Sequence, residues 1–357
     1  MSTPTELLAV LEDYIHPLIG RGLSSAGVVT EAVIADGSAR VVLTLGFPVA
    51  GIAAALTADL QALLRAALGV EAEIEVRQQI VSAAIGANLQ PLPGIRNILA
   101  VASGKGGVGK STVAVNLALA LQAEGARVGM LDADIYGPSQ PRMLGAQRRP
   151  ESPDGKIMYP VMAHGLQSMS IGYLVDDEQP MIWRGPMVSQ ALQQLLNETR
   201  WEDLDYLVVD LPPGTGDVQL TLSQRIPVSG ALIVTTPQDI ALLDARKALR
   251  MFQKVNVPVL GVVENMSTHI CSQCGHEEAI FGHGGGARMA SEYGLTLLGD
   301  LPLDIRIREQ ADSGCPTVAA DPGGALAGRY REIARRAAAG LAAATPIAFP
   351  SIEISDD

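Results

Sequence analysis

The run GKGGVGKST, from Gly104 to Thr112, constrains the fold of this 357-residue chain more than any other feature. An apolar stretch precedes it and is typical of a strand, and a run rich in alanine, valine and leucine follows it and is typical of a helix. The spacing G-x-x-x-x-G-K-[ST] between a strand and a helix is that of a phosphate-binding loop. Its glycines let backbone N–H groups turn onto phosphate oxygens, and the helix dipole favours the negative charge.

The residues of this loop have distinct expected roles. Lys110 is predicted to reach the β and γ phosphates of ATP, Ser111 to ligate Mg²⁺, and Thr112 to support the α-phosphate. The remaining loop residues expected to contact the nucleotide are Gly104, Gly106, Gly107, Val108 and Gly109.

A second lysine, Lys105, directly follows the first glycine of the loop. A lone lysine in a loop is usually a solvated charge, but this one lies where anionic charge would gather. We therefore hypothesise that Lys105 contacts a nucleotide, bound either to its own chain or to a partner subunit. It would stabilise phosphoryl transfer as an arginine finger does.

Two aspartate-bearing segments follow apolar runs downstream of the loop. DADIYGPS begins at Asp132, and we expect Asp134 to orient the attacking water while Asp132 supports the loop or the metal. DLPPGTGD begins at Asp210, which fits the Walker B position of a carboxylate facing Mg²⁺. A single aspartate after a strand is usually a helix cap or turn residue, so the phosphate loop upstream is what favours these roles. Residues 214–216 predict a mobile loop that senses the γ-phosphate.

Short apolar runs alternate with helical runs beyond residue 96, which predicts an α/β fold with a doubly wound parallel sheet of the P-loop NTPase class. Asn265 follows the last of these runs, and its amide is expected to pair with the adenine edge, although asparagine at a strand end is commonly a turn former. The expected strands are Ile98–Ala102, Arg127–Leu131, Tyr206–Val209, Ala231–Thr235 and Val259–Val263.

A small α/β domain is expected to precede this unit, over residues 1–87. Its predicted order is helix, strand, strand, helix, strand, with a hairpin at Asp36-Gly37 and a last strand, Val70–Val76, that alternates apolar and acidic residues as an antiparallel strand would. The proline-containing stretch 88–95 is interpreted as a linker, residues 96–343 as the ATPase domain and residues 344–357 as an acidic tail.

The formal net charge of -12 argues against non-specific binding to nucleic acid or to anionic lipid, since both depend on lysine and arginine. No apolar run approaches the length of a membrane span, and the N-terminal segment does not resemble a signal peptide. Three cysteines in a chain of this length favour a reducing compartment, so we expect a cytoplasmic protein.

Two of the cysteines, Cys271 and Cys274, form a C-x-x-C pair whose thiolates can point at one metal. Three interpretations compete: half of the ligands of a cluster that bridges two subunits, a zinc site completed by nearby histidines, or a free redox or structural pair. Spacing alone does not separate the first two. The third cysteine, Cys315, lies far away in sequence and is expected to be a small buried apolar residue.

The four motifs GKGGVGKST, DADIYGPS, DLPPGTGD and CSQCG, in this order, resemble the Mrp family of iron–sulfur carrier P-loop ATPases. That family belongs with ParA, MinD and the nitrogenase iron protein, and the resemblance covers roughly residues 95–343. It implies a homodimer that binds ATP and Mg²⁺, holds a labile [4Fe–4S] cluster and delivers it to apo-proteins. It maps the cluster ligands onto Cys271 and Cys274, and the switch aspartates onto Asp134 and Asp210.

Residues 1–85 are similar to a small domain often fused to or partnered with such carriers in iron–sulfur assembly. That domain often carries a cysteine where this chain has Phe47, so a docking role is favoured over thiol chemistry. We expect slow, switch-like hydrolysis that is coupled to the cysteine pair through residues 210–217. The alternatives are a positioning ATPase of the ParA and MinD type, an electron-transfer ATPase like the nitrogenase iron protein, and a zinc-stabilised dimer.

Overall fold

The structure is a computed structural model that describes residues 3–35, 37–85, 89–175, 185–271 and 273–344. The predicted turn residue Asp36, the junction at residues 86–88 and nearly all of the predicted tail, residues 345–357, lie outside the described residues. The chain divides into two compact units, one of residues 1–82 with 338–357 and the other of residues 83–337.

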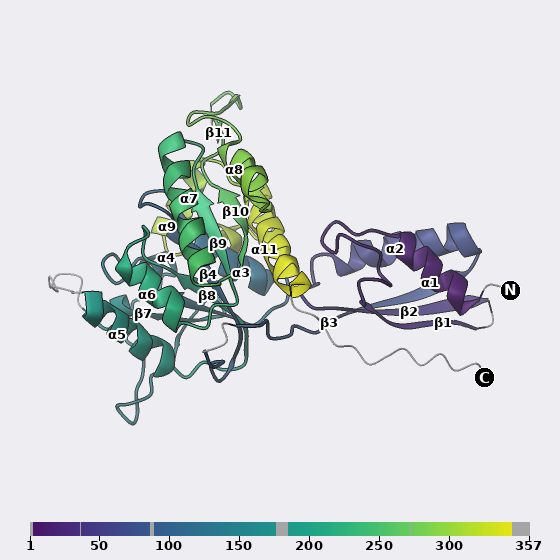
Figure 1. The fold of residues 1–357 in the computed structure, drawn as a ribbon, viewed down its shortest axis with the longest axis horizontal. Helices are drawn as coiled ribbons and strands as arrows, with labels where there is room; N and C mark the ends of the chain where they lie inside the picture. Colours follow the sequence, from purple (N-terminus) through teal and green to yellow (C-terminus); the bar gives the residue numbers. More distant parts are fainter. Residues whose placement is uncertain (1–2, 36, 86–88, 176–184, 272, 345–357) are drawn as a thin grey trace. The chain divides into compact units, whose positions relative to one another are not determined.

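The small unit has a three-stranded sheet in the order β1-β2-β3, with α1 and α2 on one face (Figure 1). Leu56, Leu60 and Leu64 recur at every fourth position of α2 and are buried, because that spacing places them on one stripe of the helix. Its elements are α1 (Pro4–Asp13), β1 (Val29–Ala35), β2 (Ser38–Leu45), α2 (Ala53–Leu68) and β3 (Glu71–Gln78).

The expected direction of the last strand is wrong: β3 pairs parallel with β2. The physical reason is the 16-residue helix α2, which carries the chain back along the sheet, so that β3 starts level with the beginning of β2. The alternation of apolar and acidic residues in β3 has a separate cause. Arg40 on β2 forms ion pairs with Glu73 at 3.4 Å and Glu75 at 3.5 Å, so these glutamates line the face away from the helices.

The large unit alternates strands and helices as predicted, and each predicted strand is present. Its strands are β4 (Ile95–Ala102), β5 (Val128–Asp132), β6 (Val161–Ala163), β7 (Leu166–Ser170), β8 (Leu204–Asp210), β9 (Gly230–Thr235), β10 (Val259–Glu264), β11 (His269–Ile270), β12 (Glu277–Glu278) and β13 (Leu297–Asp300). Its helices are α3 (Lys110–Ala123), α4 (Gln140–Met143), the 3₁₀ turn Ile171–Tyr173, α5 (Gly185–Asn197), α6 (Asp217–Arg225), α7 (Asp239–Lys254), α8 (Gly285–Tyr293), α9 (Ile305–Asp312), α10 (Thr317–Ala320) and α11 (Ala325–Ala343), whose last residues, from Ala338 on, belong to the small unit.

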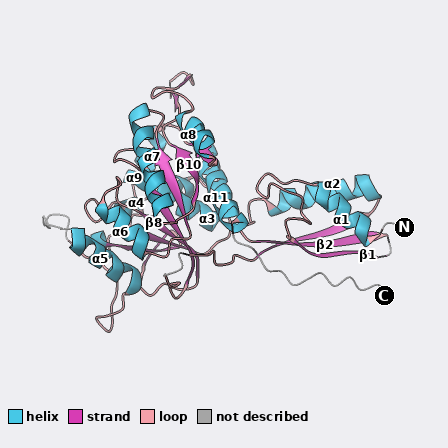
Figure 2. Ribbon diagram, viewed as in Figure 1, coloured by secondary structure: helices cyan, strands magenta, loops and turns pink. Residues whose placement is uncertain are grey.

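An eight-stranded sheet in the order β13-β10-β9-β4-β8-β5-β7-β6 forms the centre of this unit. Its neighbouring strands are parallel except for the edge strand β6, which is antiparallel to β7. Helix α3 packs on β4, β5 and β8, whereas α7 packs on β9 and β10, and Figure 2 shows helices on both sides of the strands. The chain winds outward from β4 in both directions, so the prediction of a doubly wound P-loop NTPase fold is confirmed.

Two details of the sheet were not expected. Ile95, which the prediction gave to the linker, is the first residue of β4. Strands β6, β7 and β13 were not predicted, because polar and small residues interrupt their apolar pattern. Ser168 on β7, for example, is buried through hydrogen bonds of its hydroxyl with Val161 O and the Tyr173 hydroxyl, both at 2.7 Å. Among the described residues, no helix is long and apolar enough to span a membrane.

A buried carboxylate ties the end of α3 to α11. Glu124 is 1% exposed and accepts hydrogen bonds from Arg331 at 2.6 Å and Arg335 at 2.8 Å. Burial opposes ionisation, but the hydrogen bonds from Arg335 and Arg331 outweigh it and hold the pKa of Glu124 below its usual value. We expect Glu124→Gln to lower the free energy of unfolding by about 2 kcal/mol at pH 7, less than for a fully buried pair because both arginines reach solvent.

Thermal and urea unfolding of the full chain measures this effect. Because the folded pKa of Glu124 is depressed, its contribution is fully present above the ordinary glutamate pKa and is lost as the pH falls from that value through the lower folded pKa, so the stability curves of the variant and the wild type should converge in acid. Glu332→Gln is the matched control. Glu332 lies on the same helix with its side chain 42% exposed, and we expect almost no change. Equal effects of the two variants would contradict the assignment.

Candidate functional site

The phosphate loop joins β4 to α3 at the carboxyl ends of the parallel strands, where a P-loop is expected to lie. Gly107 and Gly109 have φ values of 82° and 81°, which L-residues rarely adopt. A Cβ on Gly104 would overlap the backbone of Asp244 on α7, and one on Gly109 would overlap the amide of Asn265. These glycines are thus required by the backbone turn and by close neighbours. The loop ends at Lys110, where α3 begins and its free N–H groups face the loop.

Lys110, Ser111 and Asp210 meet at the start of α3. Lys110 is 6% exposed, its Nζ is ion-paired with Asp210 Oδ1, and it donates to Ser111 Oγ at 3.2 Å. Since one nitrogen reaches both oxygens, a hydroxyl and a carboxylate surround one point, and Mg²⁺ prefers such hard oxygen donors. The residues present therefore fit a magnesium site.

Asp132 organises the segment behind the loop. It is fully buried and accepts hydrogen bonds from the backbone N–H of Asp134 at 3.1 Å, from the backbone N–H of Ser139 and Gln140, both at 3.0 Å, and from Ser170 Oγ at 3.1 Å. These partners lie in the segment that follows Asp132 and on β7, so the expected support of the phosphate loop or the metal by Asp132 stays a prediction. Burial and the nearby charge of Asp210 raise the pKa of Asp132 to about 7.

Asp134 is half-buried, and its backbone N–H donates a hydrogen bond to the Asp132 carboxylate. Burial raises the pKa of Asp134, and the positive charge of Lys110 opposes this rise. Its carboxylate is therefore close enough to Lys110 to feel that charge. This placement is compatible with the predicted contact to an attacking water, which stays a prediction.

The raised pKa of Asp132 has a measurable consequence for stability. The folded state binds a proton more tightly than the unfolded state, so this group's contribution is fully present below pH 3.8 and is lost as the pH rises toward 7. We expect Asp132→Asn to become more stable relative to wild type between pH 5 and pH 8, whatever its starting offset. Urea unfolding in EDTA at constant ionic strength measures the difference. Two curves that run parallel over this range would contradict the prediction.

Sequence reasoning missed Gln140, the first residue of α4. Its side-chain Nε2 donates to Ser111 O at 3.1 Å and to Asp210 Oδ2 at 2.9 Å, and it is 1% exposed. One amide therefore joins the phosphate loop to the predicted Walker B carboxylate. Its position eight residues after Asp132, in the segment that returns to the site, was the available signal.

The segment after Asp210 returns to β4 and the phosphate loop. Leu211 N donates to Val101 O at 3.1 Å, and Gly214 N, at a φ of 97°, donates to Ser103 O at 3.0 Å. The predicted γ-phosphate-sensing loop is therefore attached to the strand that enters the P-loop. The side chain of Asp217, at the predicted end of this switch, lies outside the described residues.

The other predicted nucleotide contacts are placed at or beside the loop. Lys105 and Thr112 are half-buried, and the carbonyl of Lys105 accepts a hydrogen bond from Ser103 Oγ at 2.9 Å. Asn265 is 7% exposed, and its Nδ2 donates to Val108 O at 2.9 Å. Asn265 thus contacts the loop backbone itself, and its predicted contact with adenine stays a prediction.

The cysteine pair lies in the hairpin formed by β11 and β12. Cys271 N donates to His276 O at 2.9 Å, and Gly275 N, at a φ of 72°, donates back to Cys271 O at 2.8 Å. This tight turn exposes Cys274 and leaves Cys271 half-buried. Backbone N–H groups of Gln273 and Cys274 lower the pKa of the Cys271 thiol, which favours the thiolate that binds metal.

The histidines near the pair differ in their surroundings. His269 Nδ1 is hydrogen-bonded with Leu303 O at 3.0 Å, whereas His276 and His283 are exposed. Across the part of the chain that the structure describes, no group of three or more His, Cys, Asp or Glu is placed to hold a metal ion. Cys315 is half-buried after α9, where its N–H donates to Gln310 O at 3.0 Å.

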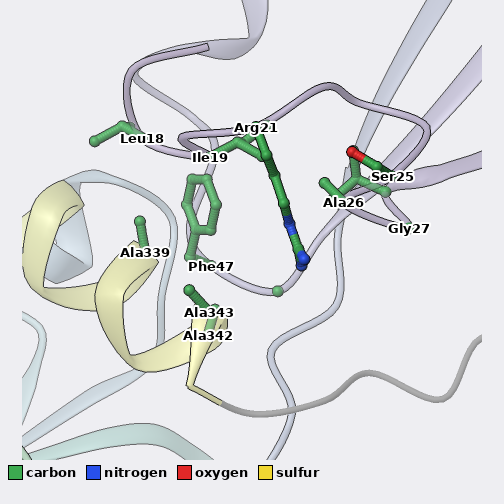
Figure 3. Close-up of a pocket in the computed structure, with 12 residues that line it drawn as sticks. Leu18, Ile19, Arg21, Ser25, Ala26, Gly27, Phe47, Ala339, Ala342 and Ala343 are labelled. Atoms are coloured by element: carbon green, nitrogen blue, oxygen red, sulfur yellow. The ribbon is translucent and has the colours of Figure 1, made fainter. Parts of the chain in front are cut away.

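In the small unit, Phe47 occupies the position where similar domains often carry cysteine. Its side chain is 4% exposed and lines a pocket of about 440 Å³ together with Ile19, Arg21 and Ala339. Figure 3 shows the Phe47 ring between Ala339 and the long side chain of Arg21. Phenylalanine therefore fills this position as a packed apolar side chain.

The fold and the phosphate loop define a P-loop nucleoside triphosphatase. The family model of NUBPL iron-transfer P-loop NTPases matches residues 94–338, and a model of iron-sulfur cluster assembly proteins matches residues 4–76. The chain belongs to the NUBPL iron-transfer P-loop NTPase family. The resemblance inferred from the four motifs is thereby confirmed.

Three known proteins illustrate the relationship. An iron-sulfur cluster carrier protein of Salmonella typhimurium is 64% identical over 255 residues, which cover 71% of this chain and 69% of that protein. One of Deinococcus radiodurans is 44% identical over 347 residues, or 96% of this chain and 97% of that protein. The solved structure of a nucleotide-binding protein from Archaeoglobus fulgidus in complex with ADP is 37% identical with a TM-score of 0.56, and covers 62% of this chain and 87% of that chain.

Proposed function

We propose that this chain is an ATP-hydrolysing carrier that holds a labile [4Fe–4S] cluster between two copies of itself and delivers it to apo-proteins. The observation that carries the proposal is the presence of a phosphate loop and a thiolate-favouring cysteine pair in one unit. Full-length relatives named as iron-sulfur cluster carrier proteins support it.

The ATPase step follows from the contacts around Lys110. The phosphates of ATP would compete with Asp210 for the Lys110 ammonium, while the N–H groups from Gly104 to Gly109 and the side chain of Thr112 surround them. Mg²⁺, held by Ser111 and Asp210, would neutralise charge on the β and γ phosphates. Asp134 would orient the attacking water, and Asn265 would contact the adenine. Because hydrolysis would act as a switch, we expect slow turnover.

The cargo site needs a second chain. Cys271 and Cys274 supply two thiolates, and a [4Fe–4S] cluster takes four cysteine ligands. A symmetric homodimer brings the same pair from each subunit to its axis and completes the set. We propose that this symmetric arrangement holds the cluster at an exposed position, from which it can leave.

The N-terminal domain expected over residues 1–87 is proposed to dock apo-proteins or an assembly scaffold. Its match to iron-sulfur cluster assembly proteins supports this role, and the buried Phe47 offers no thiol there. The acidic chain is proposed to act without nucleic acid or membrane, in a reducing compartment such as the cytoplasm.

Transfer to an acceptor tests the proposed function. The reconstituted protein is mixed anaerobically with the apo form of a small [4Fe–4S] protein, and acceptor activity is followed with and without ATP and Mg²⁺. Cluster delivery that outpaces delivery from free iron and sulfide, and that responds to ATP, is the expected result. Stable retention with reversible reduction would favour the electron-transfer ATPase instead. Zinc in place of iron would favour a structural dimer and return the positioning ATPase to consideration.

Lys105→Ala is expected to slow ATP hydrolysis at least about tenfold, because the variant loses a cation that balances charge in the transition state. Steady-state phosphate release measures the rate. Lys156→Ala is the control, since Lys156 is an exposed lysine in another loop. Hydrolysis near the wild-type rate in Lys105→Ala would contradict the role.

Mixing subunits tells whether Lys105 acts on its own nucleotide or on that of the partner. In a heterodimer of Lys105→Ala and Lys110→Ala chains, only the first chain keeps Lys110. The nucleotide bound to that chain can meet an intact Lys105 only across the interface. Activity restored by mixing therefore indicates action on the partner's nucleotide. A mixture as inactive as its two components indicates action within one chain.

A further inference from the structure

The hairpin that carries the cysteine pair leaves and rejoins the fold at one point. Residues 265–284 connect β10 to α8, and the buried carboxylate of Glu264, at the end of β10, accepts a hydrogen bond from Gly286 N at the start of α8. In Figure 1 the hairpin with β11 projects beyond β10 and α8. A change at its base can therefore move the thiols without moving the sheet.

Asn265 joins this base to the phosphate loop. Its Nδ2 donates to Val108 O at 2.9 Å, and its backbone N donates to Thr235 O at 2.7 Å. The side-chain amide also lies so close to Gly109 that no Cβ fits between them. Asn265 is thus fixed to the sheet through its backbone and to the P-loop through its side chain.

The next residue holds an unusual backbone conformation. Met266 has a φ of 57°, in the left-handed region, which is unfavourable for a residue with a side chain. The methyl group of Met266 lies 3.7 Å from the position that a Cβ on Gly109 would take. Such strain persists only where contacts with the surrounding structure maintain it. When those contacts are lost, the backbone can move to an unstrained conformation.

Hydrogen bonds hold the residues between Met266 and the cysteine turn. Ser267 donates to Leu301 O from its backbone N at 2.9 Å and from its Oγ at 3.1 Å. Leu303 N donates to Thr268 O at 2.7 Å, and Cys271 follows three residues later. The segment 265–271 is therefore held by hydrogen bonds of Asn265, Ser267, Thr268 and Cys271. These bonds extend from the P-loop to the cysteine turn.

We propose that Asn265 is a positioning residue that makes the geometry of Cys271 and Cys274 depend on the occupancy of the phosphate loop. A phosphate that reshapes the backbone at Val108 withdraws or redirects the carbonyl that Asn265 binds. The strained backbone at Met266 then relaxes, and the hairpin beyond it shifts. The inference deepens the proposed function, on which it rests, by naming how nucleotide acts on the cargo site. It differs from the route expected through residues 210–217.

Thiol reactivity in the metal-free protein tests the proposal without any cluster. The rates at which Cys271 and Cys274 react with an alkylating agent are measured by peptide mass spectrometry, with and without saturating Mg²⁺–ADP or a non-hydrolysable ATP analogue. Light scattering confirms a constant oligomeric state. Cys315 serves as the internal control thiol. Wild type is compared with Asn265→Ala and Ser267→Ala, and the control substitution is Ser152→Ala, at an exposed serine in another loop.

In the wild type we expect nucleotide to change the rates of Cys271 and Cys274 by at least about fivefold and to leave Cys315 unchanged. In Asn265→Ala the ratio should approach one, and in Ser267→Ala it should fall below half of the wild-type value. Ser267 is hydrogen-bonded to Leu301 and not to the phosphate loop. The Ser267→Ala variant therefore still tests the proposal if Asn265→Ala fails to fold or to bind nucleotide.

A wild-type ratio of one, or variants that keep the wild-type ratio, would overturn the proposal. Failure of the proposed function looks different. A protein that never binds iron and sulfide but shows the nucleotide-dependent thiol rates would lose its assignment as a carrier and keep the role of Asn265. A protein that transfers clusters with unaltered thiol rates would keep the assignment and lose this role.

Discussion

Replacing both Cys271 and Cys274 with alanine is expected to abolish binding of iron and sulfide. After anaerobic reconstitution, the wild type should hold about one [4Fe–4S] cluster per two chains, because each chain offers two thiolates and the cluster takes four. Each single replacement should also lose the cluster, since a symmetric dimer then loses two of its four ligands. Iron and sulfide analysis with optical and Mössbauer spectra measures the loading.

The control for this loss is Cys315→Ala. Cys315 lies in the loop after α9, outside the hairpin, so this variant should load like the wild type. ATP hydrolysis by the double variant should stay within about twofold, since the two thiols are not part of the phosphate loop. A full cluster in the double variant would remove the cargo site from this hairpin. Zinc in place of iron, lost with the same two thiols, would identify a structural metal.

The phosphate loop could be predicted because its backbone dictates its sequence. Gly107 and Gly109 are needed for their positive φ values, and Gly104 is needed for its approach to α7, so spacing alone locates them. The strands around the loop could be predicted for a related reason. Parallel strands covered on both faces are continuous apolar runs, as in β8 and β9, where each residue is buried.

Polar strands and strand direction could not be predicted in the same way. β7 buries two serines whose hydroxyls find partners only in the folded sheet: Ser168 with Val161 and Ser170 with Asp132. Alternation in β3 indicates one wet face, yet it carries no information on direction. The connection through α2 decides the direction, and that depends on how the helix packs.

The contacts between segments that are distant in the chain also could not be predicted from the sequence. Gln140 reaches Ser111 and Asp210, which are 29 and 70 positions away, and Asn265 reaches Val108 across 157 positions. Glutamine and asparagine are common loop residues, so only their neighbours in space mark these two. The sequence located the phosphate loop and the cysteine turn separately, whereas the structure adds the segment that joins them.

Lys110→Ala is expected to reduce ATP hydrolysis by at least about a thousandfold, because Lys110 is the cation placed to neutralise charge on the transferred phosphoryl group. Nucleotide affinity should fall about tenfold to a hundredfold, as expected for one charge-assisted hydrogen bond. Phosphate release and binding of a fluorescent nucleotide measure the two effects separately.

The same substitution should also destabilise the protein, so a loss of activity alone does not show that Lys110 takes part in hydrolysis. Lys110 is ion-paired with the fully buried Asp210, and Asp132 is buried nearby. Removing one partner of a buried pair typically costs about 3 to 5 kcal/mol, since the other charge stays buried alone. Lys110→Ala should therefore unfold at a lower temperature than wild type.

The double variant Lys110→Ala/Asp210→Asn separates the structural effect from the chemical one. Asparagine keeps an oxygen and an amide at position 210 without the unpaired charge, so most of the lost stability should return. Hydrolysis should not return, because neither the phosphate-binding cation nor the magnesium-facing carboxylate is present. If stability and hydrolysis recovered together, Lys110 would act only by neutralising Asp210, and the catalytic cation would have to be sought elsewhere in the loop, first at Lys105.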